Sequence, residues 1–228
     1  MTYAAMQTIV SQRLNEGAGA VFYPLSEIGA ALNEGQRLFV FLTLCIERTA
    51  DWTIAPGATF THMRTPFPDW IAPLRLTAAN GSKIRPVRLS DLWALDSQWP
   101  TASGPAKRYV AMGSDLVALY PTPDEDTTIP AQYAALPQAL VNAGDVPEIA
   151  AQNHPVLVSY AIYRCRMVEG AQEFEKTLEL FDEFIAAATQ YAAYVRARNQ
   201  GANFDTLPPE ISSMDRSSLV PVERAARR

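Results

Sequence analysis

The chain has 228 residues, a net charge of −5 and an isoelectric point near 5.1. Its 48% of hydrophobic and 19% of charged residues suffice for a buried core, which excludes a wholly disordered chain. The acidic balance argues against a general DNA or RNA binder, because such proteins contact phosphates through basic side chains.

Two helices are predicted in the first 52 residues. Apolar residues recur at helical spacing over 3–14, and a wider apolar stripe that includes Leu42 runs over 26–52. Ser26 is placed to cap the second helix, which must end before Pro56. Neither helix can bury its stripe alone, so both need a partner surface.

Residues 58–145 predict a small β-domain. The stretch holds ten of the 17 prolines, and prolines at that density prevent long helices. Asn80-Gly81 separates residues 70–77 from 83–89, and an Asn-Gly pair is the strongest short hairpin signal. A first hairpin is therefore expected there, followed by a short helix capped by Ser90.

A second hairpin is expected from residues 107–112 and 116–120, which flank Gly113. The stretch 119–137, "LYPTPDEDTTIPAQYAALP", reads as a further pair of strands joined by a tight acidic connection. That connection, which is expected to be a contact loop towards a partner protein or a neighbouring subunit, contains Asp124, Glu125 and Asp126.

Helical spacing returns after Pro147, where Asn153-His154-Pro155 resembles a cap followed by proline in the first turn. The last helix ends near Gly201 and repeats apolar residues in alternating steps of four and three, which predicts a seam against another helix. The seam consists of Phe174, Leu178, Phe181, Ile185, Ala188, Ala192 and Val195.

These elements predict an α+β fold, a four-helix bundle with an inserted small antiparallel β-domain and an extended C-terminal tail. The expected parts are a helical arm over 1–57, the β-domain over 58–145, a second helical arm over 146–201 and a docking tail over 202–228.

Few residues in the chain suggest chemistry. His62 and His154 are the only histidines, and neither belongs to a catalytic or metal-binding motif. Cys45 and Cys165 lack metal-type spacing and are expected to be reduced, buried thiols of a protein that folds in the cytosol. The acidic triplet at 124–126 could bind a cation, but it lacks the EF-hand pattern and is better explained as a solvated loop. No catalytic residue, metal site or cofactor is expected.

No apolar run is long enough for a membrane span, and the first residues do not resemble a secretory signal. The sequence therefore predicts a protein without a membrane partner.

The order of features resembles the head-to-tail adaptor (connector) proteins of tailed bacteriophages, the group that includes tail tubular protein A. "ALNEGQRLF" at 31–39 is similar to the Asn-x-x-x-Arg stretch of an early helix, and "WPTASGPAKRYVAMGSDLVALYPTP" at 99–123 to a Trp…Tyr…Gly…Leu-x-Pro-x-Pro segment. "YAALPQAL" at 133–140 and "VPEIAAQNHPVLVSYAIYRCR" at 146–166 resemble the strand and helix that follow. The resemblance covers about residues 5–200, through motifs that are structural and individually weak.

The resemblance implies a structural virion protein at the head–tail junction, assembled in the host cytoplasm. Copies would form a ring beneath the portal, usually matching its twelve-fold symmetry, that extends the DNA channel and carries the tail or nozzle protein. DNA would pass without sequence-specific binding, which suits an acidic ring. The alternatives are an enzyme of unknown reaction with the β-insertion as a lid, or another virion part such as a tail-completion protein.

No family motif covers the tail, so its expected role rests on composition. Its hydrophobic residues do not recur at the spacing of a helix or a strand, its prolines favour an extended chain, and its last residues are basic. We expect it to dock on the portal through Phe204, Leu207, Ile211, Met214, Leu219, Val220, Val222, Arg224, Arg227 and Arg228.

Overall fold

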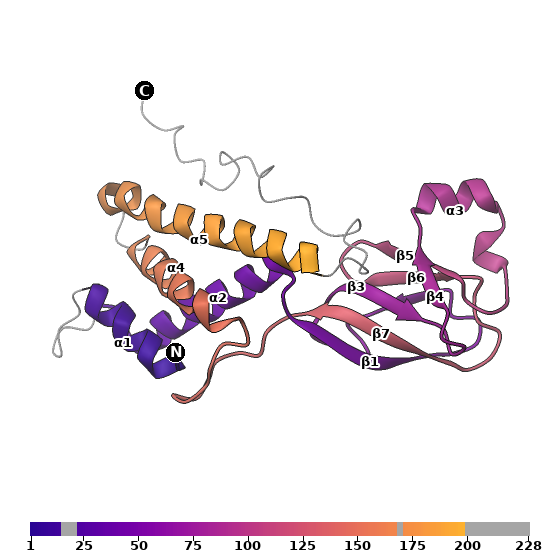
Figure 1. The fold of residues 1–228 in the computed structure, drawn as a ribbon, viewed down its shortest axis with the longest axis horizontal. Coiled ribbons are helices and arrows are strands. Elements are labelled where there is room, and N and C mark those ends of the chain that lie inside the picture. Colours follow the sequence, from indigo (N-terminus) through magenta and orange to yellow (C-terminus); the bar gives the residue numbers. More distant parts are fainter. Residues whose placement is uncertain (15–21, 168–170, 199–228) are drawn as a thin grey trace, which may run out of the picture.

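The computed structural model describes residues 1–14, 22–167 and 171–198. A helical body and a sheet head lie end to end along the long axis of the molecule (Figure 1). The helical body contains α1 (Tyr3–Arg13), α2 (Leu25–Thr43), α4 (His154–Arg166) and α5 (Ala171–Arg198), with the short 3-10 helix η2 (Ala151–Asn153) before α4. No helix in these described ranges is both long and apolar enough to cross a membrane.

The helical body is held together by aromatic packing between α2, α4 and α5. Phe184 of α5 is fully buried, and its ring centroid lies 6.0 Å from that of Phe39 and 4.8 Å from that of Tyr160. Gly35 of α2 permits this approach, because a Cβ atom there would lie 2.7 Å from Cδ1 of Tyr160. A glycine in the middle of a helix is explained here by the space that α4 needs.

The sheet head contains one curled sheet of seven strands in the order β1-β7-β3-β4-β5-β6-β2. All neighbouring strands are antiparallel except β4 and β5, which are parallel. The strands are β1 (Glu47–Ile54), β2 (Phe60–His62), β3 (Trp70–Thr77), β4 (Lys83–Pro86), β5 (Arg108–Met112), β6 (Leu116–Tyr120) and β7 (Thr127–Ala135).

The two faces of the curled sheet carry different cores. The concave face packs large side chains such as Trp52, Leu76 and Tyr109 into the main core of the molecule. On the convex face, a smaller core joins Val110 and the turn η1 (Trp99–Thr101) to the short helix α3 (Leu89–Leu95). Alternation along each strand separates the two sets.

The predicted four-helix bundle with a small inserted antiparallel β-domain is wrong. The structure has five α-helices in its described residues and a seven-stranded mixed sheet that begins inside the helix expected over 26–52. Leu44 ends α2 in the left-handed conformation (φ 55°), and β1 then pairs with β7 from Glu47 to Ile54. Ala50, Trp52 and Ile54 alternate with polar residues, which is a strand pattern, but the apolar stripe of α2 runs up to this stretch and the expected helix was extended through it.

The parallel pair contradicts the expected antiparallel sheet for a topological reason. Both predicted hairpins are confirmed, one joining β3 to β4 through Gly81 (φ 79°) and one joining β5 to β6 through Gly113 (φ 60°). Parallel neighbours need a crossover connection, and the segment that contains α3 supplies it between β4 and β5. The short helix was predicted, but its role as a crossover was not recognised. The predicted caps are wrong: Ser90 lies inside α3, which follows Arg88, and Ser26 lies inside α2, which follows Pro24.

The expected pairing within 119–137 is also wrong. β6 pairs with β5 and β2, whereas β7 lies between β1 and β3, so the two strands do not pair with each other. The connection that follows β6 instead contacts two segments that are distant in the sequence. Thr122 N–H donates to Ala102 O at 2.9 Å, and Gly57 N–H donates to Pro123 O at 2.9 Å. Pro121 and Pro123 have no N–H to continue a ladder, which explains why β6 ends there.

The seam expected on the last helix is displaced around the helix axis. Ala188, Ala192 and Val195 are buried as predicted, but Phe181 and Ile185 are only half-buried, as is Leu42 of α2. Phe184 and Thr177 take the fully buried positions. Because α5 packs on both α2 and α4, its buried face is broader than a two-helix seam.

The irregular segment 136–150 leads from the sheet head back to the helical body. One set of hydrogen bonds attaches it to α2, and another stabilises a turn within it. Asn33 of α2 donates to Leu140 O at 3.0 Å and accepts from Leu140 N–H at 2.7 Å. Asp145 Oδ2 accepts from the backbone N–H groups of Val141 (2.8 Å) and Asn142 (2.7 Å). These backbone hydrogen bonds hold the pKa of Asp145 below its ordinary value of 3.8.

The turn at Asp145 predicts an acid-dependent loss of stability. A carboxylate whose pKa is lower in the folded than in the unfolded chain stabilises the fold above about pH 4, and that contribution disappears as the pH falls through the folded pKa. We expect Asp145→Asn to show a weaker decline of melting temperature between pH 5 and about pH 3 than the wild type. The control is Asp126→Asn, an exposed residue; equal pH profiles for Asp145→Asn and the wild type would contradict the assignment.

Candidate functional site

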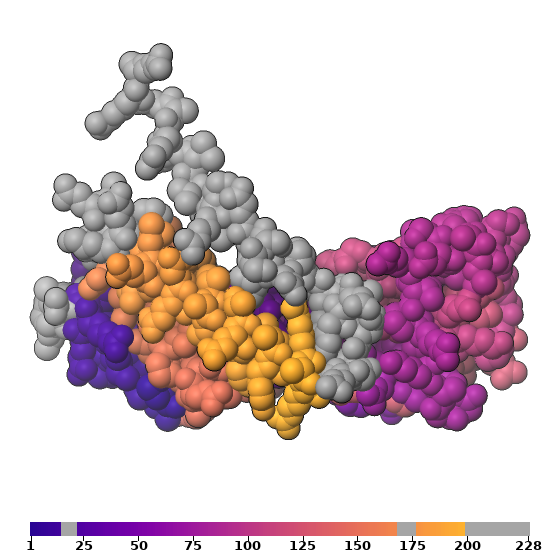
Figure 2. Space-filling model, turned by 45° about the horizontal axis from the view of Figure 1, so that its top comes forward, coloured from indigo at the N-terminus to yellow at the C-terminus, as the bar shows by residue number. Residues whose placement is uncertain are grey.

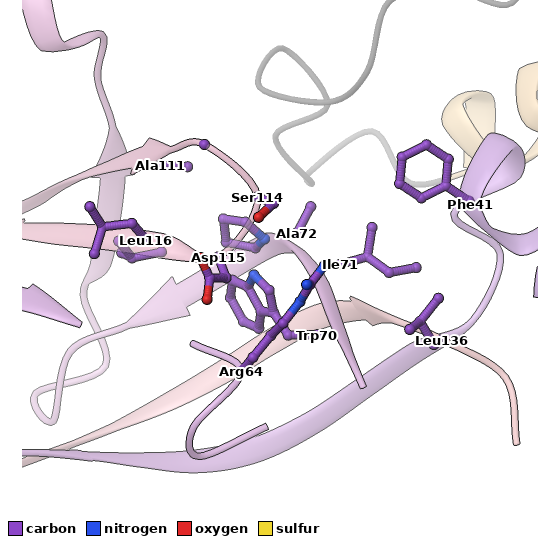
Figure 3. A pocket seen from close by; sticks show the side chains of 13 residues that line it. Phe41, Arg64, Trp70, Ile71, Ala72, Ala111, Ser114, Asp115, Leu116 and Leu136 are labelled. Carbon is purple, nitrogen blue, oxygen red and sulfur yellow. The ribbon is translucent and has the colours of Figure 1, made fainter. Parts of the chain in front are cut away.

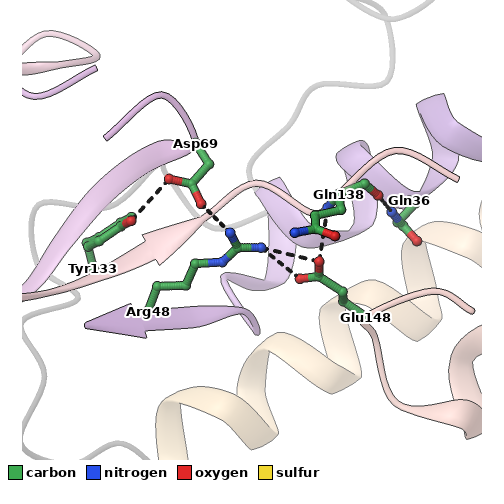
Figure 4. Close-up of polar contacts among 6 residues, drawn as sticks. All are labelled: Gln36, Arg48, Asp69, Tyr133, Gln138 and Glu148. Carbon is green, nitrogen blue, oxygen red and sulfur yellow. Dashed lines mark hydrogen bonds and ion pairs between the residues drawn. The ribbon is translucent and has the colours of Figure 1, made fainter. Parts of the chain in front are cut away.

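The joint between helical body and sheet head is built around Arg48 of β1 (Figure 4). Its Nη1 lies 2.7 Å from Asp69 Oδ2, and its Nη2 donates to both carboxylate oxygens of Glu148 at 3.0 and 3.2 Å. The Tyr133 hydroxyl donates to Asp69 Oδ1 at 3.1 Å. One guanidinium thus ties β1 to the segment before β3 and to the returning segment 136–150.

The network continues into the helical body. Gln138 N–H donates to Glu148 Oε1 at 3.2 Å, and the buried Gln36 of α2 donates through Nε2 to Gln138 O at 2.8 Å. Burial, together with the hydrogen bond to Asp69, raises the pKa of the Tyr133 hydroxyl, so it remains a neutral donor. The result is a continuous chain of polar contacts from β7 to α2, which fixes the head relative to the body.

Removing the guanidinium should loosen this joint. We expect Arg48→Ala to lower the free energy of unfolding by about 1–3 kcal/mol, because two partly buried carboxylates lose a charged hydrogen-bond partner. Urea unfolding measures the change, and Arg75→Ala, an exposed arginine on β3, is the matched control. If both variants unfold at the same urea concentration, the joint does not stabilise the fold.

An apolar groove runs along the same joint between α2 and the sheet. It consists of two adjacent hollows of about 370 and 730 Å³ that share Phe41 and Leu136. Figure 3 shows the first hollow, with Phe41 on α2 facing Ile71 and Leu136 of the head. Phe41 is 41% exposed and so presents an apolar surface in the groove.

Charged side chains lie in the lining of the groove. Arg64 and Asp115 belong to the first hollow, and Glu34 and Arg37 to the second. Glu34 is already engaged, because it accepts from the Tyr160 hydroxyl at 3.0 Å and from Arg164 Nε at 3.1 Å. An apolar centre with charged groups beside it suits contact with another polypeptide better than catalysis.

The described residues contain no candidate catalytic or metal centre. They hold no group of three or more His, Cys, Asp or Glu side chains that could bind a metal. His62 is exposed, with Nδ1 3.4 Å from Asp115 Oδ2, whereas His154 is buried and its Nε2 lies 3.1 Å from Ile149 O. Cys165 is buried, Cys45 is half-buried, and burial raises the pKa of the Cys45 thiol, which lowers its reactivity.

The structure places only part of the predicted interaction residues. Asp124, Glu125 and Asp126 are exposed in the connection between β6 and β7. The predicted tail residues, from Phe204 to Arg228, lie outside the described residues. The Arg48 network and the groove at Phe41 were not predicted from the sequence, because their members are distant in the chain: Arg48 and Glu148 are 100 residues apart.

Comparison with known proteins gives one family. The family model described as SU10 adaptor protein matches residues 1–216, which is nearly the whole chain. No curated protein matches the sequence. The match agrees with the resemblance to phage head–tail adaptors, while the narrower likeness to tail tubular protein A stays a prediction.

Proposed function

The chain belongs to the SU10 adaptor family, and from this premise we propose that it is a structural, non-enzymatic virion protein that forms a ring between the portal and the tail. The ring extends the DNA channel below the portal and provides the platform on which the tail or nozzle protein assembles. Neighbouring copies are in contact within the ring, which matches the symmetry of the portal. Assembly takes place in the host cytoplasm.

The observation that carries this proposal is the fixed joint between two separate parts. The helical body and sheet head lie end to end, and Figure 2 shows the head projecting beyond the body. The Arg48 contacts hold them at one angle, as a spacer between two partners requires. The groove at Phe41 offers an apolar surface beside this joint on which a partner can dock.

The charge of the chain supports the same function. A net charge of −5 per copy sums to a strongly acidic ring. An acidic channel repels phosphates, so DNA passes through it without sequence-specific binding. The same repulsion opposes ring closure in the free protein, which favours assembly on the portal as a template.

Portal docking is assigned to the segment 202–228. Its hydrophobic residues anchor in shallow pockets of the portal, and its basic end suits an acidic surface. The arms over 1–57 and 146–201 then form the part next to the portal, and the head, which contains most of 58–145, faces the tail.

Light scattering of the full-length protein tests the proposal. We expect the protein alone to be a monomer or weak oligomer, and a mixture with the portal of the same phage to gain the mass of one copy per portal subunit. A portal that keeps its own mass in the presence of excess protein would contradict the proposed function.

A further inference from the structure

The convex face of the sheet head carries a basic surface on an acidic protein. Residues 75–108 contain six basic and two acidic side chains, a net charge of +4, so the rest of the chain has a net charge of −9. The parallel pairing of β4 and β5 brings two of the basic residues together, because Arg85 lies directly opposite Arg108. Charge of opposite sign is thus concentrated at one place on the head.

Both arginine side chains face outward. Arg85 follows Ile84, and Arg108 precedes Tyr109; these two apolar neighbours are 1% exposed and belong to the concave core. Side chains alternate along a strand, so the arginines lie on the convex face. Among the described residues, no carboxylate lies within ion-pair distance of either guanidinium.

The two arginines border a hollow rather than a flat surface. A hollow of about 360 Å³ lies between them and α3, and Val87 and the buried Leu92 line it. Asp91 lines the same hollow, so the basic charge there is partly offset. The two arginines still outnumber this carboxylate, so the hollow suits an acidic ligand.

Exposed apolar side chains continue the surface next to the hollow. Leu95 lines it and is 54% exposed, and Trp93 of the same helix is 49% exposed. The ring of Trp93 contacts Trp99 at 5.9 Å between centroids, and Trp99 contacts Phe60 at 5.7 Å. Arginine beside exposed tryptophan is the composition of energetically important protein contacts.

The matching acidic surface belongs to the connection between β6 and β7 of the same head. Asp124, Glu125 and Asp126 are exposed, and no described residue forms an ion pair with them. The connection leaves β6 beside Arg108, which pairs with Tyr120, and Gly57 N–H donates to Pro123 O on its way to β7. The acidic and basic side chains thus belong to one head but form no ion pair with each other within the chain.

We propose that Arg85 and Arg108 of one copy bind the acidic loop 124–126 of the next copy, with Trp93 and Leu95 covering the contact. Two different, complementary surfaces that do not pair within one subunit can pair between neighbours in a head-to-tail contact, and such contacts close into a ring. The inference rests on the proposed ring and identifies the residues that join its neighbours. One loop is a small contact, but it recurs between every pair of neighbours in the ring, and its charge complementarity also selects the register.

Carbodiimide cross-linking of the full-length protein tests the contact directly. This reagent couples carboxylates to amines, and Lys107 adjoins Arg108 in the basic surface. Mixing light and ¹⁵N-labelled chains at high concentration separates links between copies from links within one copy. We expect mixed-isotope links from Lys83 or Lys107 to residues 124–126; their absence, while other mixed links form, overturns the inference.

Charge reversal on the portal gives a second test. We expect Arg85→Glu with Arg108→Glu to reduce the number of copies bound per portal at least about tenfold at a concentration just sufficient for wild-type assembly. Adding Asp124→Lys with Glu125→Lys in the same chain should restore binding, because the contact is then reversed on both sides. Arg75→Glu, an exposed arginine of β3 in the head that does not line the hollow, is the control.

The outcomes separate the inference from the proposed function. If the wild type binds the portal and Arg85→Glu with Arg108→Glu binds equally well, the proposed ring is retained and the proposed contact between neighbours is wrong. If the wild type does not bind the portal, the proposed function fails, and the isotope-mixed links in the free protein still decide the contact. Circular dichroism confirms that each variant is folded before its binding is compared.

Discussion

Replacing Phe184 with alanine is expected to lower the free energy of unfolding by about 3–5 kcal/mol, because the change leaves a large cavity in a closed core. Phe184 is 0% exposed, and its ring contacts Phe39 of α2, Tyr160 of α4 and Phe181 of its own helix. Among the side chains of α5 that the structure describes, those of residues 177–198, no other aromatic one joins three helices in this way at full burial. The loss should therefore weaken the whole helical body.

Thermal and urea unfolding measure this effect against a control from the same helix. Tyr194 also belongs to α5 but is 54% exposed, so Tyr194→Ala should cost less than about 1 kcal/mol. Equal unfolding curves for Phe184→Ala and the wild type would show that α5 does not pack as described. A large effect of Tyr194→Ala alone would place the buried face on the other side of the helix.

Deleting residues 203–228 is expected to weaken portal binding roughly 100-fold or more while leaving the folded core intact. The deletion removes all the proposed anchoring residues, from Phe204 to the basic end. It retains α1, α2, α4 and α5 and every strand of the sheet, so circular dichroism and melting temperature should change little. The matched control replaces only Arg224, Arg227 and Arg228 with glutamine, which separates charge from apolar anchoring.

The two variants give distinct results under the proposal. The deletion should lose binding at every salt concentration, whereas the glutamine variant should resemble the wild type once salt screens the charges. A truncated chain that still binds the portal at wild-type affinity would show that the helical body carries the contact.

Local signals predicted the parts of the fold that local chemistry determines. The Asn80-Gly81 turn and the turn at Gly113 need residues that accept positive φ, and both hairpins form where the sequence places them. Pro155 in the first turn likewise marked the start of α4. In each case the signal and its structural consequence lie within a few residues of each other.

The errors occurred where a distant partner decides the structure. Residues 47–54 form a strand because β7, some 80 residues later, pairs along the full length of β1. The place of β7 between β1 and β3, and the parallel contact of β4 with β5, also depend on long-range pairing. With these strands included, the sheet is larger than the small β-domain that the proline-rich stretch 58–145 predicted.

The candidate site was least accessible from the sequence. Arg48, Asp69 and Glu148 are ordinary charged residues in separate segments, and only the fold brings them together. The arginines at 85 and 108 become neighbours only through the parallel pair. By contrast, the family could be identified early, because the order of weak motifs along a chain does not depend on knowing how the strands pair.

Electron microscopy of the full-length protein mixed with its cognate portal tests the central claim most directly. The adaptor assignment predicts a ring of copies at the narrow end of the portal, coaxial with the channel and with the symmetry of the portal. Portal particles with an unchanged narrow end, or with the protein bound only at the side or the wide end, would contradict it.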